Sequence, residues 1–385
     1  MVRDRTVFLV TRNLPPLRGG MERLNAHLAA ELVAVGRVIV IGPRGCGTLA
    51  NDRTVVYEAP GASIPLFLAW AMLTSVWLAL IHRPVVVVGG SGLVAPIVRM
   101  TAWIARARAV TYLHGLDIIA PSKIYQSFWL PAIRRMEACL VNSRHTASLA
   151  RAAGVEPSRL TVIAPGVQVR QEVPADAAAS FRASYDLGEV PLMLSVGRLT
   201  VRKGLSDFVA RALPVIVEAY PSAVLVLIGD DAPDAILKGA AGERERIVAI
   251  AADLGLTTNV RMLGPVAEAV LDSAYAACDV HVFPVRDVPG DVEGFGMVAI
   301  EAAISGLPTV AFAVGGVPDA VANGVSGTLV PAGNLDMFGS AVKEVLAVGR
   351  KHYEASCKAF AEQFSWERFG VEVRAALAQL ESSKP

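Results

Sequence analysis

The chain has 385 residues, of which 53% are hydrophobic and 18% are charged, and its net charge is +1. This length and composition exclude a largely disordered protein and are sufficient for two ordinary domains. Four cysteines lie far apart with no Cys-x-x-Cys spacing, which argues against a zinc site or a disulfide framework and fits a reducing cytosol. The N-terminus runs directly into a strand-like segment at residues 6–10, so we expect no signal peptide.

The small net charge hides an asymmetry between the two halves of the chain. Residues 1–170 contain 19 Lys and Arg against 8 Asp and Glu, a net charge of +11, and the remainder carries −10. A basic half suggests an anionic partner, either nucleic acid or a membrane surface. The basic residues are scattered and form no recognisable nucleic-acid-binding module. We therefore expect the first domain to contact an anionic membrane surface and not nucleic acid.

Strand-like apolar runs alternate with helical segments along the first half, the pattern of a doubly wound α/β domain. The predicted strands cover residues 6–10, 38–41, 85–88, 109–113, 138–142 and 160–163. Predicted helices between them include residues 21–35 and 93–106.

Residues 64–81 form an uncharged apolar stretch, with Trp70 and Trp77, that is long enough to be a candidate membrane span. A span would break the strand order of the first domain, because the next predicted strand follows at once. We therefore favour a helix that packs within the domain or lies in the membrane interface.

The second half repeats the alternating pattern after a polar, alanine-rich segment at residues 168–189, which predicts a linker with a first helix. Its predicted strands cover residues 192–196, 223–228, 260–263, 280–283, 309–312 and 327–330. Ser365 is a suitable N-cap for a last amphipathic helix over residues 366–380. We expect two Rossmann-like domains, residues 1–167 and 190–365, with a cleft between them.

The most informative motif is Glu293-Gly294-Phe295-Gly296 with Glu301 eight positions after Glu293. It joins a predicted strand to a predicted helix at residues 297–305. The glycines let the backbone approach a ligand, and the helix start offers unpaired amides. Two carboxylates so placed suit two sets of hydroxyls, such as a hexose and a ribose. The alternative is a capped helix that carries two surface glutamates.

Residues 293–301 resemble the paired-glutamate signature of retaining glycosyltransferases of family 4, which have the GT-B fold. Further motifs in the family's order extend the resemblance over nearly the whole chain: Gly19-Gly20-Met21-Glu22, His114-Gly115-Leu116-Asp117, Gly197-Arg198-Leu199 with Lys203-Gly204, and residues 314–319 and 323–327. The resemblance implies two Rossmann-like doubly wound domains that face each other across a cleft. It also implies that the last helix, residues 366–385, crosses back to the first domain.

By this resemblance the second domain binds a nucleotide diphosphate sugar. Arg198 and Lys203 would hold the diphosphate and stabilise its departure, whereas Arg202 is not assigned to phosphate. Glu293 would bind the hexose and Glu301 the ribose. The other implied donor contacts are Gly19, Gly20, Gly294, Phe295, Gly296 and Leu263, the last within a segment whose backbone would contact the base.

The resemblance also puts His114 beside the transferred sugar, where it would orient the sugar and support positive charge at the anomeric carbon. A structural histidine is the alternative. Asp117 would help to place the acceptor. The implied catalytic set is His114, Arg198, Lys203 and Glu293, with the departing phosphate taking the acceptor's proton. Because these cations and helix amides compensate the charge, we expect neither a metal ion nor a cofactor.

Two other patterns suggest different chemistry. Residues 90–95 fit the G-x-G-x-x-A form of a dinucleotide fingerprint, but they follow the third predicted strand instead of the first. Asp230-Asp231 follows a strand and could suggest a metal site. The equivalent turn in the family usually lies near the nucleotide without a metal.

We therefore predict a retaining, metal-independent hexosyltransferase that extends a lipid-linked glycan or glycolipid in surface polysaccharide assembly. It would be cytoplasmic and peripheral on the inner face of the cell membrane. One alternative is a GT-B enzyme with a soluble acceptor, or a sugar-nucleotide 2-epimerase. A second is a non-catalytic sugar-nucleotide-binding protein, against which the intact set of glutamates and cations argues.

Overall fold

The computed structural model describes residues 5–17, 19–168, 174, 176–231 and 242–382, and it divides into two compact units. The first unit comprises Met1–Gly166 and Trp366–Pro385, and the second comprises Val167–Ser365. Of the predicted linker at 168–189, residues 169–173 and 175 lie outside the described residues, as do the last three residues of the predicted segment 366–385.

The first unit is built on a parallel seven-stranded sheet with the order β3-β2-β1-β4-β5-β6-β7. Its strands are β1 (Thr6–Val10), β2 (Arg37–Gly42), β3 (Thr54–Glu58), β4 (Val86–Gly89), β5 (Arg108–Leu113), β6 (Ala138–Val141) and β7 (Leu160–Val162). Strand β3 was not predicted from the sequence. It lies at the sheet edge and is mostly half-buried, and its apolar run, Val55 to Tyr57, is only three residues long.

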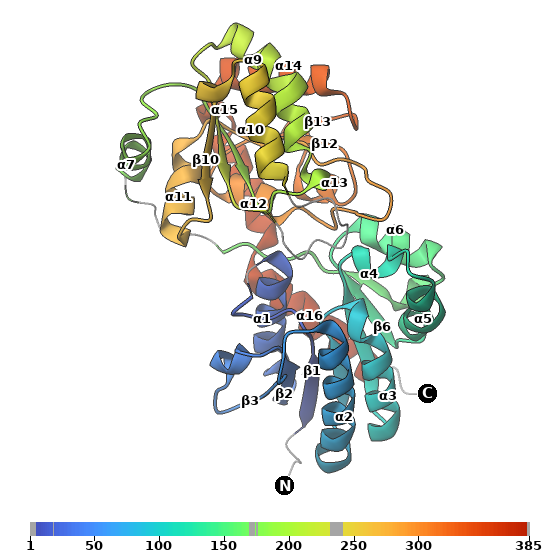
Figure 1. Ribbon diagram of the computed structural model, residues 1–385. Helices are drawn as coiled ribbons and strands as arrows, with labels where there is room; N and C mark the ends of the chain where they lie inside the picture. Colours follow the sequence, from blue (N-terminus) through green and yellow to red (C-terminus); the bar gives the residue numbers. More distant parts are fainter. Residues whose placement is uncertain (1–4, 18, 169–173, 175, 232–241, 383–385) are drawn as a thin grey trace. The chain divides into compact units, whose positions relative to one another are not determined.

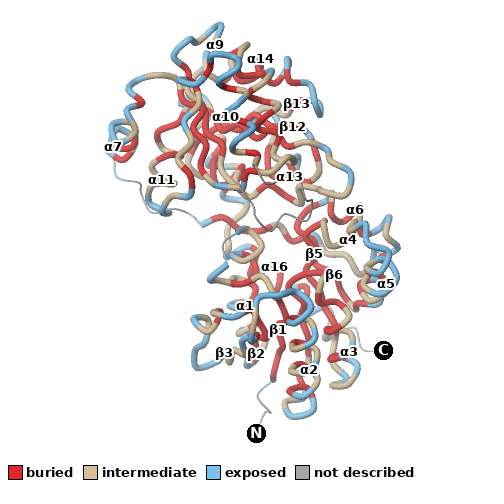
Figure 2. The backbone as a smooth tube through the Cα atoms, in the orientation of Figure 1, coloured by how far each residue is buried: buried red, intermediate tan, exposed pale blue. Residues whose placement is uncertain are grey.

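Helices cover both faces of this sheet (Figure 1). They are α1 (Gly20–Leu32), α2 (Ile64–His82), α3 (Ala95–Ala105), α4 (Leu116–Ile119), α5 (Leu130–Arg134), α6 (Arg144–Ala152) and α16 (Trp366–Ser382). Because side chains alternate along a strand, Phe8 and Val10 pack with α2 and α3, whereas Val7 and Leu9 pack with α1 and α16. Figure 2 shows the central strands buried between these layers.

The C-terminal helix α16 is an integral part of the first unit. Phe369, Val373 and Leu377 recur every four residues and join the core beside α1. Trp366 stacks on His27 with ring centroids 3.8 Å apart, and Arg374 pairs with Glu31 of α1. Strand β1 and helix α16, far apart in the sequence, therefore share one hydrophobic core.

Helix α2 connects β3 to β4 and lies on the sheet, as expected for a parallel crossover. Phe67, Ala71, Leu78 and Ala79 form its buried side. Among the described residues it is the one helix long and apolar enough to cross a membrane, and 28% of its apolar window is buried. Its remaining surface carries large exposed apolar side chains: Leu66, Leu73, Trp77, Leu80 and Ile81.

The second unit contains a parallel six-stranded sheet with the order β10-β9-β8-β11-β12-β13. Its strands are β8 (Leu192–Val196), β9 (Val224–Ile228), β10 (Val260–Gly264), β11 (Val280–Phe283), β12 (Thr309–Phe312) and β13 (Gly327–Val330). Its helices are α7 (Ala177–Ser184), α8 (Leu205–Asp207), α9 (Leu213–Ala219), α10 (Glu243–Asp253), α11 (Glu268–Ala277), α12 (Met297–Ile304), α13 (Val317–Ala320), α14 (Leu335–Val348) and α15 (Arg350–Ala361). All six of these strands were predicted from the sequence.

Candidate functional site

Each sheet has one point where the strand order reverses, between β1 and β4 in the first unit and between β8 and β11 in the second. In open α/β sheets, ligands bind beyond the carboxyl ends of the strands at such a point. The predicted site residues follow these ends: Gly19 and Gly20 after β1, His114 after β5, Arg198 and Lys203 after β8, and Glu293 after β11.

Two cations of different exposure follow β8. Arg198 is exposed and makes no ion pair within the described residues, whereas Lys203 is largely covered. The turn ends at Gly204, which has a φ of +69° and lies so close to β11's loop that a Cβ would be 2.0 Å from the Pro284 carbonyl oxygen. Only glycine fits there. The turn with Lys203 is thereby held against the loop that leads to Glu293.

Lys203 and Glu293 are in direct contact. The Nζ atom of Lys203 lies 2.9 Å from Oε2 of Glu293, and Arg202 pairs with the same oxygen through Nη1. The Nε atom of Arg202 lies 2.9 Å from Oδ1 of Asp291. Lys203 also lies over the ring of Phe283, 4.6 Å from its centroid. The structure thus brings together Lys203, predicted to bind the diphosphate, and Glu293, predicted to bind the hexose. Arg202 and Asp291 join the same cluster.

This arrangement fixes the charge of Glu293. Burial by itself would raise its pKa, but the positive charges of Arg202 and Lys203 outweigh burial and lower the pKa to about 2. The pKa of Lys203 is lowered by burial and by Arg202 and Arg198, which together outweigh the attraction of Glu293. Because one carboxylate pairs with two cations here, the cluster favours the charged form of Glu293 more strongly than the charged form of Lys203.

The loop after β12 supports the Glu293 turn from the other side. The Gly316 N–H donates to the Glu293 carbonyl at 2.8 Å, and a Cβ on Gly316 would lie 2.1 Å from the Gly294 carbonyl oxygen. The glycine pair in the motif at residues 314–319 therefore has a packing reason. Glu293 is held by three loops of one sheet edge.

Glu301 lies on α12 and is 3% exposed. The hydroxyl of Tyr275, on α11, donates to its Oε2 at 3.0 Å. Gly296 precedes α12, Phe295 is buried against Phe364, and Leu263 is half-buried at the end of β10. The roles of these residues in donor binding stay predictions.

His114 is largely buried at the end of β5. Its Nε2 atom lies 2.9 Å from the Gly90 carbonyl oxygen, at the end of β4. A carbonyl oxygen only accepts, so this contact assigns the ring proton to Nε2 and leaves Nδ1 as an acceptor in the neutral ring. The role of His114 beside a transferred sugar stays a prediction.

Asp117 bonds to backbone amides. Oδ1 accepts the N–H groups of His114 and Gly115 at 3.0 Å each, and Oδ2 accepts the Gly92 N–H at 2.8 Å. Asp117 thus ties the loop after β5 to the loop after β4, with both carboxylate oxygens engaged. Gly92 belongs to the fingerprint-like run 90–95, so this contact gives that run a structural role.

Gly19 and Gly20 stand where predicted, at the start of α1 and the end of the loop after β1. The Gly19 carbonyl accepts the first helical hydrogen bond, from Arg23, at 3.2 Å. In the second unit, Asp230 pairs with Arg244 at 3.2 Å, and Asp231 accepts the Arg244 N–H at 3.2 Å. The two aspartates therefore share an arginine in this structure.

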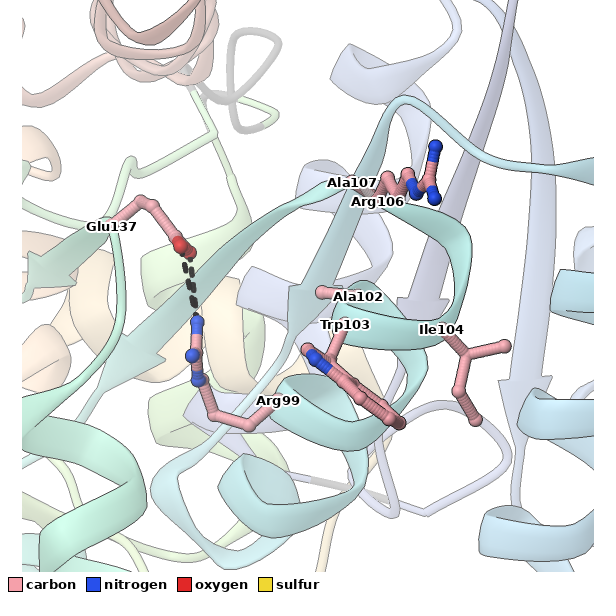
Figure 3. A pocket seen from close by; sticks show the side chains of 7 residues that line it. All are labelled: Arg99, Ala102, Trp103, Ile104, Arg106, Ala107 and Glu137. Atoms are coloured by element: carbon pink, nitrogen blue, oxygen red, sulfur yellow. Dashed lines mark hydrogen bonds and ion pairs between the residues drawn. The ribbon is translucent and has the colours of Figure 1, made fainter. Parts of the chain in front are cut away.

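A surface hollow lies elsewhere on the first unit, between the end of α3 and the start of β5 (Figure 3). It is lined by Arg99, Ala102, Trp103, Ile104, Arg106, Ala107 and Glu137, and Arg99 pairs with Glu137 at 3.0 Å. It lies at the amino end of β5, whereas His114 follows the carboxyl end. None of the predicted site residues lines it.

Three residues around Glu293 and Glu301 are not among the residues predicted to act in the site: Arg202, Asp291 and Tyr275. The sequence does contain a signal for Asp291. It lies two positions before Glu293, and residues two apart share one side of an extended segment. No local pattern marks Tyr275, which lies 26 residues from its partner Glu301.

Two family profiles match successive parts of the chain. The profile described as Glycosyltransferase Family 4 matches residues 18–171, and Glycosyl transferases group 1 matches residues 179–364. A curated relative, the GDP-mannose-dependent alpha-(1-6)-phosphatidylinositol monomannoside mannosyltransferase of Mycolicibacterium smegmatis, is 29% identical and aligns over 90% of each chain. The D-inositol 3-phosphate glycosyltransferase of Geodermatophilus obscurus is 35% identical over 56% of this chain and 46% of its own.

Solved structures share the fold over the full length. Anabaena HepE in complex with UDP superposes with a TM-score of 0.76 at 20% identity, covering 97% of this chain and all of that one. Sucrose-phosphate synthase from Thermosynechococcus elongatus superposes with a TM-score of 0.77 at 21% identity, covering 99% of this chain and all of that one. Two matched profiles, a relative aligned over nearly the whole length and these neighbours lead to one conclusion: the chain belongs to glycosyltransferase family 4 and has the GT-B fold.

Proposed function

We propose that this glycosyltransferase moves a hexose from a nucleotide diphosphate sugar to a lipid-linked acceptor, with retention of configuration and without a metal ion. The observation that carries the proposal is the contact of Lys203 with Glu293 at the strand reversal of the second sheet. The contact brings the cation that we assign to the diphosphate and the carboxylate that we assign to sugar hydroxyls within reach of one ligand. The exposed Arg198 on the same loop adds a forked phosphate donor.

The relatives suggest the identity of both substrates. The mycobacterial enzymes are described as using GDP-mannose on a phosphatidylinositol monomannoside, and the shorter alignment is to an enzyme that acts on D-inositol 3-phosphate. Both acceptors contain an inositol phosphate. We therefore propose mannose as the first candidate sugar and an inositol-phosphate glycolipid as the first candidate acceptor.

Retention is supported by the chemistry of Glu293. A general base works best with a pKa near the working pH, whereas the pKa of Glu293 is about 2. Glu293 is therefore a poor base for activating an acceptor hydroxyl from the opposite face. The departing phosphate, held by Arg198 and Lys203, is the better proton acceptor. These two cations also supply the charge compensation that a divalent ion provides in other enzymes.

An apolar face on the first unit supports a membrane location. The side chains of Leu73, Trp77 and Leu80 on α2 are 73%, 56% and 63% exposed, and Trp103 on the adjoining α3 is 74% exposed. Tryptophan is enriched at membrane interfaces, and Trp103 and Arg106 line the same hollow (Figure 3). With the basic charge of residues 1–170, this face fits the cytoplasmic surface of an anionic membrane.

The main test is a transfer assay with GDP-mannose and UDP-glucose, each offered a phosphatidylinositol mannoside or free inositol phosphate. We expect transfer to the lipid, an α-linked product by NMR, and full activity in EDTA. A β-linked product from an α-linked donor would contradict retention. Loss of activity in EDTA with rescue by a divalent ion would contradict the metal-free mechanism.

The D-inositol 3-phosphate relatives favour one second candidate, the same transfer to a soluble acceptor. Transfer to free inositol phosphate and none to the lipid would establish it. Nucleotide-sugar binding with neither transfer nor donor hydrolysis would instead support a non-catalytic binding protein.

The membrane part is tested separately by sedimentation with vesicles. Anionic vesicles should bind the wild type at low salt, and binding should weaken with salt and with neutral vesicles. The double variant Leu73→Gln/Trp77→Gln should bind less, whereas Val348→Gln, an exposed apolar residue of α14, should bind normally. A folded wild type that ignores anionic vesicles at low salt would exclude this docking and leave the transferase proposal standing.

A further inference from the structure

Four charged side chains form a closed cluster beside the donor loops of the second unit. Arg202 and Lys203 come from the turn after β8, and Asp291 and Glu293 come from the loop after β11. Their side chains are only 11%, 14%, 22% and 14% exposed, respectively. Two cations balance two carboxylates, so the charge of Lys203 is already neutralised by Glu293 in this structure.

An arriving diphosphate must therefore compete with Glu293 for Lys203. If Lys203 turned to the phosphate and nothing else held Glu293, a covered carboxylate would lose its only cation next to a new anion. Removing one partner of a buried ion pair is strongly unfavourable. The site needs a second cation that stays on Glu293.

Arg202 meets this requirement in geometry. Its planar guanidinium pairs with Glu293 through Nη1, and its Nε lies within ion-pair distance of Asp291 without forming a hydrogen bond, so two carboxylates restrain its position. Its backbone is fixed as well, because its carbonyl accepts the Arg286 N–H at 2.8 Å. Lys203 has a single point charge on a flexible stem and can change partners at less expense.

We propose that Arg202 is a positioning residue that holds the Glu293 carboxylate in place and charged while Lys203 passes from Glu293 to the donor's diphosphate. This inference rests on the proposed donor role of Lys203. Both cations contact Oε2 of Glu293, and no contact of Oε1 is found among the described residues. Oε1 is therefore available for a sugar hydroxyl.

The charged groups around Glu293 define what removal of Arg202 would do. Arg202 pairs with Asp291 and Glu293, and Lys203 pairs with Glu293. The positive charge of Arg198 lowers the pKa of Lys203. Arg286 is paired with Asp207 at 3.2 Å. His281 below Lys203 is buried, and burial together with Lys203 lowers its pKa to about 3, so it carries no charge at neutral pH. If Arg202 is removed and Lys203 moves to the diphosphate, Glu293 loses both of the cations that pair with it among the described residues, and we expect it to take up a proton.

The test is proton uptake on binding of UDP or GDP, measured at pH 6 by titration calorimetry in buffers of different ionisation enthalpy. Arg202→Gln should take up more protons than the wild type, by as much as about one per nucleotide. Its affinity should fall roughly tenfold to a hundredfold at neutral pH, the range seen when a supporting residue of a binding group is lost. Affinity should recover as the pH falls, because protonated Glu293 no longer needs a partner.

Matched variants separate this role from a merely structural one. Arg202→Lys should restore part of the wild-type behaviour, and Arg211→Gln, an exposed arginine paired with Asp336 at 3.8 Å, should behave as wild type. If Arg202→Gln does not fold, Asp291→Asn releases the Nε contact and should show a smaller extra proton uptake. Wild-type proton counts and affinities in the folded variants would overturn the proposal. Failure of the wild type to bind either nucleotide would overturn it together with the proposed donor.

Discussion

The carboxyl edges of the two sheets hold their polar side chains in different ways. In the first unit, His114 bonds to the Gly90 carbonyl, and Asp117 bonds to three backbone amides. In the second unit, Lys203 and Glu293 bond to each other, and Arg202 links Glu293 to Asp291. One edge is fixed by backbone, and the other is fixed by side-chain charge.

The difference indicates what each edge can recognise. A site held by backbone keeps its shape whether or not a ligand is present, which suits hydroxyl groups that bring no charge. A site held by paired charges should respond to an added anion, because we propose that a diphosphate draws Lys203 away from Glu293. We therefore expect substitutions of the paired charges in the second unit to alter nucleotide binding strongly, and a substitution of His114 in the first unit to alter transfer alone.

The largest effect is expected at the two cations after β8. Arg198→Ala and Lys203→Ala should each lower kcat/KM about a hundredfold or more and weaken nucleoside diphosphate binding, because each removes a donor that stabilises the leaving group. Lys203→Ala should also lower the melting temperature, since it leaves covered Glu293 with one cation, whereas exposed Arg198 should not. Lys358→Ala, in a surface pair with Glu354, is the control. Normal nucleotide affinity in both variants would remove these residues from the phosphate site.

The two glutamates should separate by ligand. Glu293→Ala should spare or improve bare nucleotide binding, because it frees Lys203, and should impair sugar-nucleotide binding. Glu301→Ala should weaken both, because both ligands carry the ribose. Calorimetry with the nucleotide and the sugar nucleotide distinguishes the two, and the reverse pattern would exchange the assignments.

A smaller effect is expected at His114. His114→Ala removes one hydrogen-bond partner, so transfer should fall roughly tenfold, while nucleoside diphosphate affinity should stay unchanged. Steady-state kinetics with calorimetry on the same preparation would check this. A loss of nucleotide affinity equal to that of Lys203→Ala would erase the contrast between the two edges.

The smallest effect at working pH concerns acid stability. The folded-state pKa of Glu293 is about 2 against an ordinary value of 4.5, so its ionised form stabilises the fold above pH 4.5. This stabilisation is lost as the pH falls from 4.5 towards 2. Denaturant unfolding of Glu293→Gln should show a weaker dependence of the free energy of unfolding on pH in that window. An unchanged dependence would mean that the pair does not hold Glu293 ionised.

Much of this architecture could be predicted from local sequence. Buried parallel strands are continuous apolar runs, so all six strands of the second unit and the central strands of the first were identified, together with the family 4 motifs at their ends. The strand Thr54–Glu58 was missed because its apolar run covers only three residues between Thr54 and Glu58, whereas the edge strands β7 and β10 were predicted.

The sequence by itself determined the fold class, the family and the order of the glycine-flanked loops, since each depends on residues close together in the chain. The tertiary structure decided which side chains meet. Arg202 and Glu293 are 91 positions apart, and Asp117 reaches Gly92 across 25. Such contacts depend on which strand ends are neighbours in the sheet and on the space that Gly204 and Gly316 leave between loops. In the sequence, nothing distinguishes Arg202 from the other basic residues of the chain. Only the tertiary structure shows that it pairs with the Glu293 carboxylate.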